Sequence, residues 1–374
     1  MEGQHLRRSL QTLTSSDGSV VRLKHGQSLI NFASNDYLDL ARDPLLQEAA
    51  QRAIGEHGVG SGSSRLICGS TGPHASLEEA LAEFKGTKAA LTFSSGYAAA
   101  MGFGTAILDR NAVVLLDKLC HASLIDACRL SGAAMRVFRH NDLEKLDELL
   151  AWARRKFPTS TAVYVVTESV FSMDGDCAPL AEIVALKERY GASLLLDEAH
   201  AIGVLGPGGR GLAAELGLTD RIEIHMGTMS KSLGVSGGYL AGSAIMRDLL
   251  INKARSFIYS TAPPPAIAAT AEVALRYLES DQGDERRARL RKRAISLALG
   301  LALPKPLTAI LPLVVGEEVA ALNLATDLRE NGFFVPAIRY PTVGRGQARL
   351  RFTVTAGHAQ PQIDELVQTV LRCR

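Results

Sequence analysis

One lysine in this chain stands among hydroxyl-bearing and small residues, in the segment Thr228-Met229-Ser230-Lys231-Ser232-Leu233-Gly234. Lysine is the side chain that forms Schiff bases with carbonyl compounds, and its amine must then be shielded from water and bulky neighbours. The hydroxyls of Thr228 and Ser230 would suit a phosphate group held beside that amine. Because the same composition is also typical of an ordinary loop, the interpretation depends on the segments upstream.

A second group of reactive side chains follows the apolar run Ser193-Leu194-Leu195-Leu196 and reads Asp197-Glu198-Ala199-His200. The pattern predicts a buried strand with polar residues at its C-terminal end, which is where open α/β sheets bind ligands. Pyridoxal 5'-phosphate (PLP) needs an anionic partner for its pyridine nitrogen. Asp197 suits that role, and His200 is near enough in the sequence to contact the same ring. The alternative is that Asp197 only caps a following helix.

Two further segments have the same form. Thr92-Phe93-Ser94-Ser95-Gly96-Tyr97 reads as a strand end, a turn and the start of an Ala-rich helix, whose first N–H groups and dipole would bind an anion. His121 follows the apolar run Val113-Val114-Leu115-Leu116-Asp117 and could stack on a flat heterocycle. A tight turn and a structural histidine would explain each segment alone. All four signals follow apolar strands, and together they favour one site.

The tetrapeptide Asp-Glu-Ala-His also matches a helicase motif, which would make the protein an ATPase. A P-loop would require Gly-x-x-x-x-Gly-Lys-Ser/Thr. The sequence contains no Gly-Lys dipeptide, so this class is excluded.

Taken together, the segments resemble the α-oxoamine synthases, fold-type I PLP enzymes that condense an amino acid with an acyl-CoA. Further matching stretches are Asn31-Phe32-Ala33-Ser34-Asn35-Asp36-Tyr37-Leu38, Gly60-Ser61-Gly62-Ser63-Ser64-Arg65-Leu66, Phe171-Ser172-Met173-Asp174-Gly175-Asp176, Ile258-Tyr259-Ser260-Thr261 and Ala348-Arg349-Leu350-Arg351-Phe352-Thr353. The resemblance runs from about residue 30 to the C-terminus. It implies a large PLP-binding α/β domain with a mainly parallel seven-stranded sheet and a smaller α+β C-terminal domain.

The resemblance also implies roles for particular residues. Lys231 would hold PLP and remove the Cα proton of the amino acid, Asp197 would bind the pyridine nitrogen, and His121 would stack on the ring. The remaining cofactor contacts would come from His200 and Ser172 to the phenolic oxygen, and from Gly96, Tyr97, Thr228 and Ser230 to the phosphate. Thr261 would reach the phosphate in the other subunit of a homodimer. No metal site is expected.

Substrate contacts are implied in the same way. Arg351 would hold the carboxylate of the amino acid as a bidentate fork, with Thr353, His121 and Asn35 as further substrate-binding residues. Asn35 would approach the site of the neighbouring subunit. Arg7 is a candidate for the anionic acyl thioester, although an N-terminal arginine is also typical of a solvated surface.

Two branches of the family share motifs with this chain. Ala337-Ile338-Arg339-Tyr340-Pro341-Thr342-Val343 resembles the biotin-pathway branch, which uses L-alanine and a pimeloyl thioester, whereas Arg65-Leu66-Ile67-Cys68-Gly69 leans towards glycine C-acetyltransferase. The favoured function is an acyltransferase reaction: L-alanine and pimeloyl-CoA, or a pimeloyl carrier-protein thioester, give 8-amino-7-oxononanoate, CoA and CO2. A catalytically silent relative would lack the lysine, and Lys231 is present. An aminotransferase would not be expected to carry both the Asn35–Leu38 and the Phe171–Asp176 signatures.

Composition agrees with a cytoplasmic enzyme that binds small molecules. The 41 basic and 39 acidic residues give a net charge of +2, so no basic field awaits nucleic acid. The five scattered cysteines lack metal-ligand spacing and suit a reducing compartment. The N-terminus lacks the pattern of a signal peptide, and no run approaches the ~20 apolar residues of a membrane span.

Periodicity predicts alternating helices and strands. The expected helices span residues 76–84, 143–157, 179–190 and 284–293, and the expected strands span 161–166, 193–197, 222–228, 238–242, 311–315, 333–336 and 349–354. Repeated βα units imply a mainly parallel sheet. With a break at Pro263-Pro264-Pro265, the expected organisation is an N-terminal segment 1–33, a PLP-binding domain 34–262 and a C-terminal domain 263–374.

Overall fold

The computed structural model describes residues 10–24 and 26–374, and the chain forms two compact units. The large unit comprises residues 43–171 and 177–284, and the small unit comprises the residues up to Arg42, residues 172–176 and residues 285–374. The short excursion 172–176 and the N-terminal residues thus group with the C-terminal part of the chain. The predicted domain boundaries after residues 33 and 262 stay a prediction.

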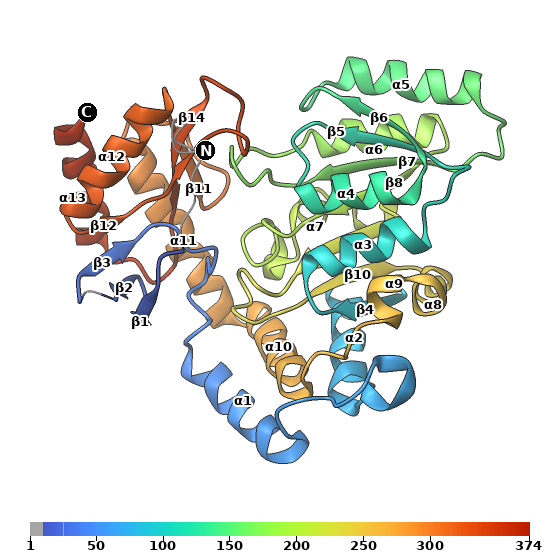
Figure 1. Ribbon diagram of the computed structural model, residues 1–374, viewed down its shortest axis with the longest axis horizontal. Coiled ribbons are helices and arrows are strands. Elements are labelled where there is room, and N and C mark those ends of the chain that lie inside the picture. The colour runs from blue at the N-terminus through green and yellow to red at the C-terminus, as the bar shows by residue number, and fades with distance from the viewer. Residues whose placement is uncertain (1–9, 25) are drawn as a thin grey trace. The chain divides into compact units, whose positions relative to one another are not determined.

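The large unit is built on one seven-stranded sheet, of strand order β4-β10-β9-β8-β7-β5-β6 (Figure 1). Its strands are β4 (Ala89–Phe93), β5 (Val113–Asp117), β6 (Ala134–Phe138), β7 (Val163–Glu168), β8 (Ser193–Asp197), β9 (Ile224–Thr228) and β10 (Gly238–Gly242). Only β10 runs against its neighbours, β4 and β9. The expectation of a mainly parallel seven-stranded sheet is therefore confirmed.

Helices connect and cover these strands. In the large unit they are α1 (Pro44–His57), α2 (Gly72–Phe84), α3 (Gly96–Ala106), α4 (Ala122–Ser131), α5 (Leu143–Lys156), α6 (Leu180–Arg189), α7 (Leu212–Glu215), α8 (Ala244–Lys253), α9 (Arg255–Ile258) and α10 (Pro265–Leu278). The helix α5 shows why the sequence pattern succeeds. Asp142 caps it by accepting the Lys145 N–H, and Leu146, Leu149 and Ala153 form its buried face at helical spacing.

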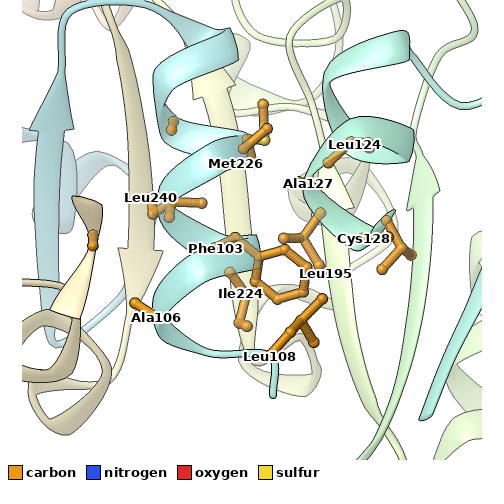
Figure 2. Packing of buried hydrophobic residues seen from close by; sticks show 14 of the residues in the cluster. Phe103, Ala106, Leu108, Leu124, Ala127, Cys128, Leu195, Ile224, Met226 and Leu240 are labelled. Atoms are coloured by element: carbon orange, nitrogen blue, oxygen red, sulfur yellow. The ribbon is translucent and has the colours of Figure 1, made fainter. Parts of the chain in front are cut away.

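Helices α3 and α4 pack against the sheet through a large apolar core (Figure 2). Phe103 of α3 lies there with Leu195 of β8 and Ile224 of β9. The two helices approach closely at Gly104, where a Cβ would lie 2.4 Å from the carbonyl oxygen of Ala127. Because this packing fixes both helices, it also fixes their N-terminal ends, which carry Gly96 and His121.

The small unit has two short sheets and two helices of its own. One sheet joins β1 (Leu13–Asp17), β2 (Val20–Leu23), β3 (Ser28–Asn31) and β12 (Phe333–Phe334), and the other joins β11 (Ile310–Gly316), β14 (Ala348–Thr353) and β13 (Ala337–Ile338). The helices are α12 (Glu318–Glu330) and α13 (Gln360–Cys373), while α11 (Asp281–Gly300) passes from the large unit into the small one. This is the expected α+β composition.

Candidate active site

The C-terminal ends of parallel strands meet at one edge of the large sheet. A cavity of about 240 Å³ lies there. It is lined by Ser95, Gly96, Tyr97, His121, Ser123, Glu168, Asp197, Ala199, His200, Met226, Thr228, Ser230 and Lys231. Most of these residues end or follow β4, β5, β7, β8 and β9, which is where an open α/β sheet binds its ligand. The four sequence signals are thus brought into one site.

A larger hollow of about 470 Å³ lies over α5. Its charged lining residues include Lys145 and Glu148, which pair with each other and are exposed to solvent. Charges in water neither gain altered reactivity nor hold a ligand strongly. The cavity at the strand ends is therefore the candidate active site.

Lys231 and His200 make a close polar contact in the cavity. The Lys231 Nζ lies 2.8 Å from the His200 Nε2, and the His200 side chain is buried. Lys231 follows β9 and His200 follows β8, so the contact joins two neighbouring strand ends. The residue types and burial suit an amine that attacks a carbonyl compound.

Asp197 supplies a buried carboxylate in the same cavity. Its Oδ1 accepts the Ala199 N–H at 2.9 Å. Burial raises the pKa of Asp197, while Lys231 opposes that shift by attraction. The contact between Asp197 and Ala199 lies within the turn after β8, and no helix begins at this turn. Asp197 therefore does not act as a helix cap.

A buried ion pair between Glu198 and Lys85 stabilises the turn that carries Asp197 and His200. Glu198, which is fully buried, lies 2.5 Å from the Nζ of Lys85 and accepts the Ala213 N–H at 3.0 Å. Lys85 also donates to the carbonyl oxygen of Arg210 at 2.6 Å. Lys85, together with His225, outweighs burial and lowers the pKa of Glu198 to about 2.

His121 is held at both its backbone and its ring. As the N-cap of α4, its Nδ1 accepts the Ser123 N–H at 3.2 Å and lies 2.8 Å from the Ser123 Oγ. Its backbone N–H donates to the Glu168 carboxyl group. Burial lowers the pKa of His121, an effect that Asp197 opposes. The lowered pKa favours the neutral ring, which can present an apolar face.

Small residues and hydroxyl groups form another part of the cavity lining. The Ser95 Oγ caps α3 by accepting the Ala98 N–H at 3.1 Å, and the first N–H groups of a helix have no partner inside it. The Thr228 Oγ1 lies 2.8 Å from the Ser230 Oγ. The backbones approach so closely that a Cβ on Gly238 would lie 2.5 Å from the Gly96 nitrogen. This concave set of donors suits a phosphate group.

The side chain of Tyr97 is half exposed, and its hydroxyl group bonds to a residue that does not line the cavity. Its hydroxyl donates to the Asp126 Oδ2 at 2.9 Å, and that bond raises the pKa of the tyrosine. Its backbone N–H remains in the first turn of α3. The predicted phosphate contact by Tyr97 is therefore available to its backbone.

The predicted carboxylate-binding residues lie together in the small unit. The buried Arg351 donates from Nε to the carbonyl oxygen of Ser172 at 2.6 Å and from Nη1 to the Thr353 Oγ1 at 2.9 Å. Both terminal nitrogens also contact the Asn35 Oδ1, at 3.2 and 3.3 Å. A planar guanidinium held in this way suits a carboxylate. Ser172 belongs to this unit, and its predicted contact with PLP stays a prediction.

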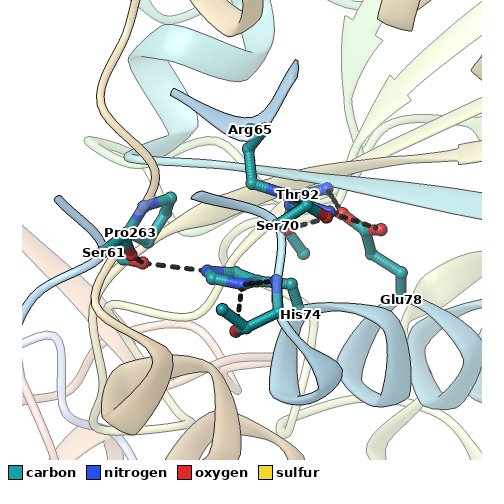
Figure 3. A network of polar contacts seen from close by, with 8 residues as sticks. Ser61, Arg65, Ser70, His74, Glu78, Thr92 and Pro263 are labelled. Atoms are coloured by element: carbon teal, nitrogen blue, oxygen red, sulfur yellow. Dashed lines mark hydrogen bonds and ion pairs between the residues drawn. The ribbon is translucent and has the colours of Figure 1, made fainter. Parts of the chain in front are cut away.

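Thr261 is exposed and does not line the cavity of its own chain, all of whose lining residues are described. It pairs with Ser64. Two residues further on, the carbonyl oxygen of Pro263 lies 2.6 Å from the Ser61 Oγ and 2.8 Å from the His74 Nε2 (Figure 3). The helix α10 begins only at Pro265, so Thr261 does not cap it. These contacts, and not proline alone, fix the loop.

The network of Figure 3 extends this support to the sheet. Arg65 forms an ion pair with Glu78 of α2 at 2.9 Å and donates to the Thr92 Oγ1 at 3.1 Å. Thr92 belongs to β4, whose end leads into the cavity. The segment that carries Ser64, the bridge partner of Thr261, is thus anchored to the strand that leads to Ser95.

Three further expectations concern Arg7, a metal site and membrane-spanning helices. Arg7 lies outside the described residues, so its role stays a prediction. Among residues 10–24 and 26–374, no group of three or more histidine, cysteine, aspartate or glutamate side chains could hold a metal ion. Within the same residues, no helix is long and apolar enough to cross a membrane.

Sequence reasoning missed Glu168 and Gly238 as site residues. Glu168 ends β7, two residues beyond the predicted strand 161–166, so its place near a strand end was a usable signal. Gly238 begins a strand that the pattern placed correctly, but nothing in the sequence tells that Gly96 lies against it. Lys85 is remote in sequence from Glu198, and no pattern links the two.

Comparisons with known proteins agree with this geometry. The family model described as aminotransferase class I and II matches residues 27–370. The 8-amino-7-oxononanoate synthase of Anaeromyxobacter sp. (strain K) is 46% identical over 371 residues, which cover 97% of this chain and 91% of that protein.

Two solved structures extend the likeness to the fold. The serine palmitoyltransferase of Sphingomonas wittichii has a TM-score of 0.91 at 31% identity, over 96% of this chain and 90% of that one. A high-resolution structure of SPT with a PLP internal aldimine has a TM-score of 0.92 at 31% identity, over 97% and 92% of the two chains. The expected fold-type I architecture is confirmed, and the chain belongs to the aminotransferase class I and II family.

Proposed function

We propose that the cavity at the strand ends binds PLP and that the protein is a PLP-dependent acyltransferase. The observation that carries this proposal is the meeting of Lys231, His200 and Asp197 in one cavity. The start of α3 at Gly96 and the hydroxyl of Thr228 supply hydrogen-bond donors in the cavity that fit the phosphate of the cofactor. The SPT structure that holds PLP supports the same cofactor.

When bound, PLP supplies an electron sink for the negative charge that forms at the Cα of an amino acid. Lys231 would hold the cofactor through its Nζ and then remove the Cα proton. Asp197 would keep the pyridine nitrogen protonated by its charge. His121 would cover one face of the ring, and His200 with Ser172 would bind the phenolic oxygen. The N–H groups of Gly96 and Tyr97 and the hydroxyls of Thr228 and Ser230 would hold the phosphate.

The substrates follow from the relatives. L-Alanine and a pimeloyl thioester would condense, with loss of CoA and CO2, to give 8-amino-7-oxononanoate for biotin synthesis. The name shared by several relatives at 42–47% identity supports this choice. Arg351 would bind the alanine carboxylate, and Thr353 with Asn35 would orient its guanidinium. Arg7 would serve the acyl thioester.

The proposed working unit is a cytoplasmic homodimer in which Thr261 reaches the phosphate of the neighbouring site. Thr261 is exposed on an anchored loop. Large apolar side chains near Thr261 and near its bridge partner Ser64 in the sequence are also exposed, with Tyr259 at 73% and Ile67 at 80%. A second copy of the chain would bury such side chains with a gain of about 25 cal/mol per Å².

The test is CoA release by the PLP-loaded protein, with alanine, glycine and serine each crossed against acetyl-, pimeloyl- and palmitoyl-CoA. Alanine with pimeloyl-CoA should give the highest kcat/KM. Lys231→Ala should abolish turnover, and Lys118→Ala, which removes an exposed lysine after β5, should retain it. A preference for glycine with acetyl-CoA would overturn the substrate assignment. Borohydride reduction that labels a lysine other than Lys231 would overturn the cofactor assignment.

A further inference from the structure

The proposed chemistry leaves one carboxyl group of the cavity unused. Glu168 ends β7, lines the cavity and is only 2% exposed. A buried carboxyl group is costly unless it is hydrogen-bonded. Its presence therefore calls for a partner that compensates that cost.

That partner is the backbone of His121. The Glu168 Oε1 accepts the His121 N–H, while Ser123 holds the imidazole from the other side. We propose that Glu168 is a positioning residue: by accepting this N–H it fixes the start of α4 and keeps the His121 ring over the cofactor. The inference rests on the proposed binding of PLP in this cavity.

The position of Glu168 beside Asp197 decides whether its carboxyl group is protonated when it accepts the His121 N–H. The two residues are register partners on the adjacent parallel strands β7 and β8, whose backbones are ~5 Å apart. Two carboxylates so close cannot both be charged at little cost. Burial and the charge of Asp197 raise the pKa of Glu168 to about 8. Glu168 thus carries a proton at pH 7.

A neutral carboxylic acid has a close mimic in glutamine, whose carbonyl oxygen also accepts an N–H. The proposed role therefore predicts an unusual order of PLP affinity among the variants of Glu168. Glu168→Gln should preserve PLP binding better than Glu168→Asp, which keeps the charge type but withdraws the acceptor by one methylene. Glu168→Met fills the same space and removes the acceptor altogether.

The experiment titrates the apoprotein of each variant with PLP and records the visible circular dichroism of the bound cofactor. Glu168→Met should raise the Kd for PLP roughly tenfold, as expected when a buried donor loses its acceptor, and should diminish the dichroic band. Glu168→Gln should stay within about threefold of the unsubstituted protein. Thr167→Val is the matched control, because it removes a fully buried hydroxyl from the preceding residue of β7, outside the cavity. It should leave both readouts in place.

A second arm tests whether Glu168 acts through His121. In a His121→Ala background, Glu168→Met should change the Kd by less than about twofold, because residues that act as one unit are not additive. A tenfold effect in both backgrounds, or a Glu168→Gln variant as weak as Glu168→Met, would overturn the inference. If Glu168→Met does not fold, as judged by melting of the apoprotein, Glu168→Asp carries the same comparison. Failure of the unsubstituted protein to bind PLP would instead overturn the proposed function.

Discussion

The ion pair between Lys85 and Glu198 leads to a prediction about stability whose magnitude follows from the structure. Lys85 and Glu198 are at most 1% exposed, and they lie 2.5 Å apart. In Lys85→Met the carboxyl group of Glu198 loses its cation while staying buried. Removing one partner of a buried pair costs about 3–5 kcal/mol. We therefore expect Lys85→Met to be destabilised by this amount at pH 7.

The pKa of Glu198 gives a second, independent magnitude. Its ordinary value of 4.5 falls to about 2 in the folded protein. At about 1.4 kcal/mol for each pH unit, this difference corresponds to about 3 kcal/mol of stability. Because the folded pKa is the lower one, the contribution is complete above pH 4.5 and is lost as the pH falls through 2. At pH 3 about 1 kcal/mol should remain.

The assay is thermal unfolding of the apoprotein, followed by circular dichroism at pH 7 and at pH 3. For a unit of this size, about 3 kcal/mol lowers the melting temperature by about 6–12 °C. The difference between Lys85→Met and the unsubstituted protein should shrink at pH 3. Adding Glu198→Gln should recover part of the loss at pH 7, because it removes the uncompensated charge. A Lys85→Met protein that melts within about 2 °C of the unsubstituted one at pH 7 would refute the reasoning.

Three further predictions concern the site itself. Asp197→Asn should slow exchange of the alanine Cα proton with solvent by orders of magnitude, measured by proton NMR in deuterium oxide; an unchanged rate would remove Asp197 from its role. Arg351→Lys should raise the KM for alanine about tenfold and alter the KM for the acyl thioester little, because lysine cannot form the bidentate fork; equal changes in both would contradict carboxylate binding. Mixed dimers of Lys231→Ala chains with Thr261→Ala chains should recover about half of the wild-type activity, since both defects then fall in one site of two; no recovery after proven subunit exchange would place each site within one chain.

Much of the candidate site could be predicted from the sequence because each part follows a strand. Asp197, Thr228 and His121 all lie at or just beyond the C-terminal ends of apolar runs. Parallel strands bring those ends to the same edge, so the linear pattern predicts proximity without any knowledge of the packing. The strand 238–242 was predicted with the bounds that the structure gives, and β9 and α5 differ from prediction by only a few residues.

The rest depends on contacts that leave no local pattern. The partner of Glu168 is a backbone N–H 47 residues away, and every residue except proline carries such a group. The partner of Glu198 is Lys85, 113 residues away. The small strand β3 pairs with β12, which comes some 300 residues later in the chain. Helical or strand periodicity carries no information about pairs of this kind.

Asp197, Glu198 and Glu168 show why residue type alone cannot assign electrostatic roles. Asp197 and Glu198 are neighbours in the sequence and both are buried, yet the pKa of the first is raised and that of the second is lowered to about 2. Asp197 lines the cavity, whereas Glu198 bonds to Lys85 and the backbone of Ala213. Glu198 therefore anchors the turn, and its charge is already neutralised by Lys85. The carboxyl group of Asp197 is left facing the cavity, and the proton that Glu168 holds at pH 7 keeps this second carboxyl group uncharged.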